Sequence, residues 1–223
     1  MSSENPSFVE TYYVRYHIGK THPRVLVDAV HAKFPDGEVN TGRLVDEVVD
    51  RADCSGIVAR VSRKEADLNR PFTDENKSAL RHYRGAVYNI LHEGHLLDDS
   101  LRTIRPFLHI ALHGMHDIRN GPDIVLGTRK GRVCDPVICE WLSNLLEQDG
   151  YKVAVDRIFP GSSGLEYFRS GVRSKVFTGY GQNYHVVQLE LSRELRRNRN
   201  IDRTVEMISQ IIESFHRQSF EYI

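Results

Sequence analysis

The sequence predicts an α/β fold, with a mostly parallel or mixed twisted sheet covered by helices on both faces. Short β-branched apolar runs alternate with longer amphipathic runs, the pattern of strands followed by crossover helices. The length of 223 residues suffices for one such domain and is short for two. We therefore expect residues 1–223 to form a single domain, with residues 1–20 as an N-terminal extension.

The predicted strands are short apolar runs that end in polar residues, glycine or proline. The first is interrupted only by Asp28, and the last carries Glu190 among apolar neighbours. Their expected spans are 25–30, 57–61, 107–112, 124–126, 151–155 and 184–191.

Four helices are predicted from apolar residues that recur every three or four positions. Thr41 is expected to cap the first helix, Gly94 follows the second, and Gly150 lies just past the third. Their expected spans are 41–51, 74–93, 135–146 and 201–215.

Composition excludes several classes of function. Lys+Arg and Asp+Glu both number 30, and this balance argues against a nucleic-acid-binding protein. We interpret the basic cluster at 193–199 as a solvated loop. Residues 1–16 lack the apolar core of a signal peptide, and no apolar run approaches the length of a membrane span. Three cysteines without a Cys-x-x-Cys pair favour a reducing compartment, so we expect a soluble, cytoplasmic protein.

Candidate functional residues follow the predicted strands. In open α/β sheets, ligands bind at the carboxyl ends of the strands. The first strand leads to His31, the second to Arg63, the third to His113 and the last to Glu190. We expect these side chains to gather at one edge of the sheet.

Two histidines and nearby acids suit a catalytic zinc site. Zinc accepts imidazole nitrogen and carboxylate oxygen, and a catalytic site keeps a position open for water. We predict His31, His113 and Glu38 as ligands of Zn²⁺. Asp36, in the same loop as Glu38, is the rival third ligand.

Metal-assisted hydrolysis also needs a group that accepts and returns a proton. We predict this role for Glu190, because an acid inside an apolar strand is costly unless it is used. The alternative is that strand alternation turns Glu190 toward solvent. Arg63 can stabilise an oxyanion, or it can belong to a salt-bridge network with Asp67 and Arg70 that orders the loop.

The remaining candidates suit an anionic small-molecule substrate. The Arg70 guanidinium can bind a carboxylate through two hydrogen bonds, and Asn69 can add a third. Arg193 follows the last strand and is expected to contact the substrate. The small-residue turn that holds Ser163 and Gly164 can approach a ligand closely or serve only as a turn.

These motifs resemble the N-formylglutamate amidohydrolase family, whose fold is similar to that of zinc carboxypeptidases. The resemblance extends from about residue 25 to residue 193, and the order and rough spacing of its motifs agree with the family. The motifs are Ser62-Arg63 with Asp67-Leu68-Asn69-Arg70, Leu112-His113-Gly114-Met115, Asp123-Ile124-Val125-Leu126-Gly127, the turn 160–164 and Gln188-Leu189-Glu190-Leu191-Ser192-Arg193.

The resemblance implies that His31 and His113 bind zinc, that Glu190 is the catalytic carboxylate, and that Asn69 and Arg70 hold a substrate carboxylate. It implies a zinc-dependent hydrolase that cleaves the amide of an N-acylated or γ-linked glutamate. The alternatives are a metallocarboxypeptidase and a non-catalytic binding protein of the same fold. The chain departs from the family in having Val30 before His31, where proline is usual, and Ala111 in place of an acid.

Overall fold

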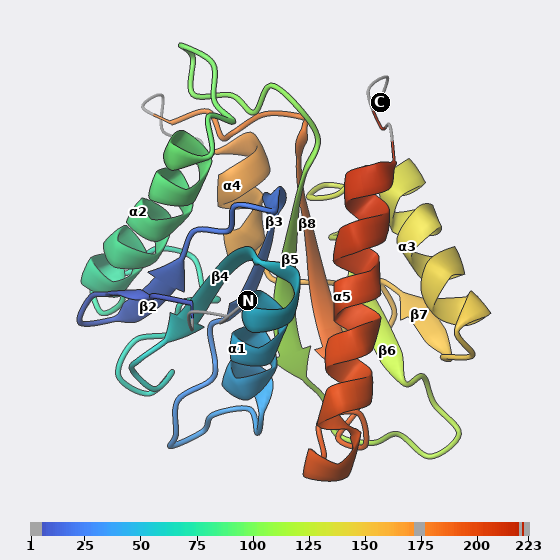
Figure 1. Cartoon of the computed structure of the whole chain (residues 1–223). Coiled ribbons are helices and arrows are strands. Elements are labelled where there is room, and N and C mark those ends of the chain that lie inside the picture. Colours follow the sequence, from blue (N-terminus) through green and yellow to red (C-terminus); the bar gives the residue numbers. More distant parts are fainter. Residues whose placement is uncertain (1–5, 172–176, 219, 221–223) are drawn as a thin grey trace.

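The computed structural model describes residues 6–171, 177–218 and 220. Its centre is one eight-stranded sheet with the strand order β1-β2-β4-β3-β5-β8-β6-β7 (Figure 1). The strands are β1 (Val9–Glu10), β2 (Val14–His17), β3 (His22–Ala29), β4 (Cys54–Ala59), β5 (Phe107–Gly114), β6 (Ile124–Gly127), β7 (Val153–Val155) and β8 (Tyr184–Leu191).

The sheet is mixed. Its four central strands, β4, β3, β5 and β8, are parallel, so their carboxyl ends lie at one edge. Strand β2 is antiparallel to β4, and β6 is antiparallel to β8. The central strands are largely buried on both faces, which explains why their apolar residues do not alternate strictly with polar ones.

Helices cover both faces of this sheet, as predicted (Figure 1). One face packs against α1 (Thr41–Ala52), α3 (Pro136–Gln148) and α5 (Ile201–Arg217). The other packs against α2 (Lys77–Glu93) and the short helix α4 (Glu166–Ser170), which follows a 3₁₀ turn at Ser163–Leu165.

The N-terminal region differs from the expected extension. Part of residues 1–20 forms β1 and β2, which add two antiparallel strands at one edge of the sheet. Strand β1 has only two residues, both exposed, so it lacks the apolar run that marks a strand in sequence. The second predicted strand also begins earlier, at Cys54 rather than at residue 57, because Ser55 and Gly56 pair within the buried sheet.

Two further expectations concern local structure. Thr41 is the first residue of α1 rather than its cap, and its hydroxyl donates a hydrogen bond to the carbonyl of Glu38 at 2.9 Å. All three cysteines are buried and free. Within the described ranges, no helix has the length and apolar character needed to cross a membrane.

Candidate active site

A cavity of about 1320 Å³ opens at the carboxyl edge of the four parallel strands. Nine of the ten residues predicted from the sequence line it, and they come from five separate segments of the chain. They are His31, Glu38, Arg63, Asn69, Arg70, His113, Ser163, Glu190 and Arg193. The tenth residue, Gly164, lies behind the cavity wall, close to the backbone of Asn69 and Arg70.

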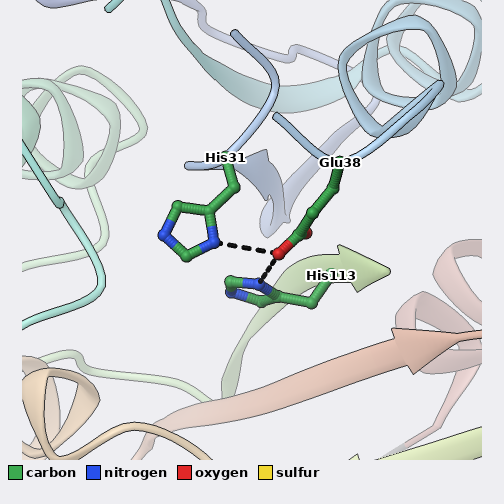
Figure 2. A group of neighbouring side chains, drawn as sticks. All are labelled: His31, Glu38 and His113. Atoms are coloured by element: carbon green, nitrogen blue, oxygen red, sulfur yellow. Dashed lines mark hydrogen bonds and ion pairs between the residues drawn. The ribbon is translucent and has the colours of Figure 1, made fainter. Parts of the chain in front are cut away.

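The centre of the site is a group of two histidines and one carboxylate. His31 lies two residues past β3, Glu38 lies in the loop before α1, and His113 lies near the end of β5. One potential ligand atom from each lies within 4.8 Å of the others. Figure 2 shows both rings directed at the same carboxylate oxygen: Glu38 Oε1 lies 3.0 Å from His31 Nδ1 and 3.3 Å from His113 Nδ1.

Several hydrogen bonds hold Glu38 in this position. Its backbone N–H donates to the carbonyl of His31 at 2.7 Å, which closes the loop between the two residues. Oε2 accepts from the backbone N–H of Gly114 at 2.9 Å, and Oε1 accepts from Arg63 at 2.7 Å. Burial raises the pKa of Glu38, but the hydrogen bonds and charges of His113 and His31 outweigh burial and hold this pKa far below its usual value.

The rival acid, Asp36, does not reach this group. Its side chain is 54% exposed and forms an ion pair with Lys64 at 3.4 Å. Asp36 lines the outer part of the cavity, whereas the Glu38 side chain is only 13% exposed. The arrangement therefore favours Glu38 over Asp36 as the acid that can share a metal with the two histidines.

Asp67 orients the first histidine. Its Oδ1 lies 2.8 Å from His31 Nε2, and it also accepts from the backbone N–H of Asn69 at 2.9 Å. Burial raises the pKa of Asp67, but its bonds to His31 and Asn69 and the charge of Arg70 bring it below the usual value. From the sequence, Asp67 was expected only as a member of a salt-bridge network with Arg63 and Arg70. It does contact Arg70, at 3.4 Å, but its contact with His31 is shorter.

Glu190 lies beside the histidines rather than in solvent. It is 5% exposed, pairs in register with His113 on the adjacent strand, and lines the cavity. Gln188, two residues earlier on the same face of β8, donates a hydrogen bond to its Oε1 at 2.8 Å. Burial raises the pKa of Glu190 above its usual value, although His113 and Gln188 both oppose the shift.

The arginines and Asn69 form the outer wall of the cavity. Arg63 is turned inward onto Glu38, whereas the side chain of Arg70 is 74% exposed. Asn69 Oδ1 is buried and, within the described part of the chain, has no hydrogen-bond partner. The Arg193 side chain forms no hydrogen bond or ion pair with any described residue, so its charge is available to a ligand.

The turn at 159–164 closes one side of the cavity. The Ser162 N–H donates to Gln188 Oε1 at 3.0 Å, and its hydroxyl donates to the carbonyl of Asn69. This segment passes so close to β6 that a Cβ atom on Gly127 would lie 2.6 Å from the Gly161 nitrogen. Glycine at 127 therefore lets the turn reach the site.

Arg196 shows that the basic cluster at 193–199 is not simply a solvated loop. It is 7% exposed and donates to the carbonyls of Leu191, Val39 and Met115 at 3.2, 2.8 and 2.9 Å. It thereby joins three segments around the cavity. The sequence offered no signal to separate Arg196 from its exposed neighbours, whereas Gln188 could have been found from its position two residues before Glu190.

The cavity combines three features: a group of residues that can bind a cation, a carboxylate with a raised pKa, and an outer part rich in arginine. Two imidazoles and a carboxylate converge as a divalent cation requires, and a carboxylate with a raised pKa lies next to them. Six arginines and four carboxylates line the cavity, so its outer part favours an anion.

Comparison with known proteins agrees with the resemblance found in the sequence. The model of the N-formylglutamate amidohydrolase family matches residues 93–196, which confirms the resemblance over a span that contains His113 and Glu190. His31, Glu38 and Asn69 precede this span. No curated protein matches the sequence.

Solved structures share the fold at low sequence identity. N-formylglutamate amidohydrolase from Ralstonia eutropha JMP134 aligns with a TM-score of 0.69 and 14% identity, covering 92% of this chain and 97% of that one. A gene product from Agrobacterium tumefaciens aligns with a TM-score of 0.58 and 10% identity, covering 91% and 92%. A bacteriophage poly-γ-glutamate hydrolase aligns with a TM-score of 0.52 and 13% identity, covering 93% and 92%.

Proposed function

We propose that this chain, which matches the N-formylglutamate amidohydrolase family over residues 93–196, is a zinc-dependent amidohydrolase. Its proposed substrate is an N-acylated or γ-linked glutamate with a free carboxylate. The observation that carries the proposal is the convergence of His31, Glu38 and His113 beside the buried carboxylate of Glu190.

The residues present fit a zinc ion. If His31 Nε2–H donates to Asp67, the neutral ring presents the lone pair of Nδ1 to the carboxylate of Glu38, 3.0 Å away. Two acceptors then face each other, and a cation between them resolves the conflict. Nitrogen and carboxylate ligands, with a second carboxylate behind a ligating imidazole, are typical of zinc sites.

Bound at these three residues, zinc would polarise a carbonyl and lower the pKa of water. Glu190 would accept the proton of the attacking water and return it to the leaving amine nitrogen, which splits the amide into an acid and an amine. Its raised pKa brings it closer to the working pH of a general base that must later act as an acid.

The arginines would bind and orient the substrate. Arg70 and the side-chain NH₂ of Asn69 would donate hydrogen bonds to the free carboxylate of the substrate. The unpaired Oδ1 of Asn69 would be available to accept from an N–H group of the substrate. Arg193 would supply a second positive charge, and Arg63, turned toward the centre, would stabilise the oxyanion of the tetrahedral intermediate. The excess of arginines over carboxylates supports a small anionic substrate.

The test is hydrolysis by protein whose metal content is controlled. Chelator-treated protein should be inactive, and added zinc should restore release of formate from N-formyl-L-glutamate. Hydrolysis of poly-γ-glutamate tests whether the substrate is a γ-linked glutamate. Hydrolysis of a peptide with a free C-terminus tests the carboxypeptidase alternative. Binding of these anions without cleavage of any of them would instead favour the binding protein.

The three buried, free cysteines are consistent with the predicted cytoplasmic location, which we retain as part of this proposal.

A further inference from the structure

A buried polar cluster lies behind the proposed metal site, on the same face of the sheet. Its centre is Asp28, the next-to-last residue of β3, which is fully buried. Asp28 Oδ2 lies 2.7 Å from His109 Nε2 and also accepts from the Tyr83 hydroxyl of α2. The Tyr184 hydroxyl lies 3.0 Å from His109 Nδ1. When that hydroxyl donates to Nδ1, the His109 ring carries its proton on Nε2 and donates it to Asp28.

The strand register places Asp28 between two histidines. Asp28 pairs with Ala111 on the neighbouring strand β5, so His109 is two residues before its partner and His113 two residues after it. Residues two apart in a strand share a face, and the small side chain of Ala111 leaves room between the two rings. On the other side, Asp28 pairs with the apolar Ile57 of β4, which offers no polar group.

Two buried atoms in this region lack hydrogen-bond partners among the described residues. They are Asp28 Oδ1 and His113 Nε2. One is an acceptor and the other can donate, and buried polar atoms are rarely left unpaired.

We infer that Asp28 is the positioning residue for His113: its Oδ1 accepts the Nε2 proton, directly or through one water, when Nδ1 binds the metal. This inference rests on the proposed zinc site. It gives His113 the same support that Asp67 gives His31, so that each ligating imidazole has a carboxylate on its far nitrogen. The difference is that Asp28 comes from the neighbouring strand β3 and is shared with His109.

Asp28→Asn tests this role with little change of shape. The bonds from His109 and Tyr83 can be kept by the amide oxygen, which leaves the NH₂ group to face His113. An NH₂ group there favours a lone pair on Nε2 and a proton on Nδ1, the nitrogen that must bind zinc. Loss of such an outer carboxylate typically weakens metal binding about 10–100-fold, and we expect that range.

The measurement is the zinc dissociation constant of metal-free protein, obtained by competition with a coloured chelator. Tyr83→Phe is the matched control, because it removes a bond to Oδ2 but leaves Oδ1 intact. It should leave zinc affinity unchanged even if it lowers the melting temperature. Equal weakening in both variants, or unchanged affinity in a folded Asp28→Asn variant, would overturn the inference while the proposed function stands.

Two further outcomes are decisive. If the wild-type protein binds no zinc, the inference and the proposed metal site fall together. If Asp28→Asn shows no cooperative thermal transition, the imidazole NMR signals of zinc-loaded wild-type protein decide instead. A hydrogen-bonded, downfield Nε2 proton on His113 supports the inference, and an Nε2 proton at the position of a free imidazole overturns it.

Discussion

Replacing Glu190 with glutamine separates catalysis from structure at this site. The side chain is 5% exposed, and its Oε1 accepts from Gln188 at 2.8 Å. Glutamine has nearly the same size, and its carbonyl oxygen can keep that hydrogen bond. It cannot, however, take a proton from water. The fold and the three proposed zinc ligands should therefore survive while the proton acceptor is lost.

The expected effect is large. General acid–base catalysis contributes about 10²–10⁴-fold, so kcat should fall by that factor. At 1.36 kcal/mol for each factor of ten, this corresponds to about 2.7–5.5 kcal/mol of transition-state stabilisation. Zinc content should stay near that of the wild-type protein, because Glu190 is not among the three converging ligands.

The assay is release of formate from N-formyl-L-glutamate, with zinc measured on the same samples. Glu140→Gln, the same change on an exposed position of α3, is the matched control and should have no effect. A rate within threefold of the wild type, with full zinc, would refute the role of Glu190 as general base. Loss of zinc together with activity would make Glu190 a ligand instead.

Three other substitutions test neighbouring parts of the account. Glu38→Ala should lose zinc and Asp36→Ala should keep it, as measured by metal analysis, and the reverse order would move the third ligand to Asp36. Gln188→Ala removes a hydrogen bond that stabilises the Glu190 carboxylate and lowers its pKa. The pKa of Glu190 should therefore rise further above its usual value. Because the carboxylate is the active form, the acid limb of kcat/KM should move to higher pH, and a limb that stays in place or moves down would contradict this. Arg70→Lys keeps the charge but loses the two-pronged hydrogen bond, so KM should rise about tenfold in steady-state assays, and an unchanged KM would assign Arg70 to its ion pair with Asp67 alone.

The central part of the fold was predictable because buried strands are rich in apolar residues, and this enrichment is visible in the sequence. Strands β3, β5 and β8 are largely buried on both faces and therefore contain apolar runs that do not alternate strictly with polar residues. Strands β1 and β2 could not be found in this way. Both strands are short and partly exposed. They form by pairing with the edge of the sheet, and this tertiary contact leaves no apolar run in the sequence.

The candidate site was predictable where its residues lie at the ends of strands. His31 and His113 follow from the rule that ligands bind at the carboxyl ends of parallel strands. The contacts behind them depend on tertiary structure. Asp67 reaches His31 across 36 positions of the sequence, and Asp28 lies beside His113 only through the register of β3 and β5. Nothing local in the sequence distinguishes Asp67 from a surface carboxylate. The apolar run around Asp28 indicates that this acid is buried, but it does not identify His113 as a neighbour.

Metal stoichiometry tests the central claim most directly. Protein loaded with zinc and then dialysed should retain about one zinc per chain, as a three-ligand catalytic site does. His31→Ala and His113→Ala should each lose it, while His116→Ala, which changes a histidine that lines the same cavity outside the converging group, should retain it. No zinc in the wild-type protein, or full zinc in both His31→Ala and His113→Ala, would contradict the account.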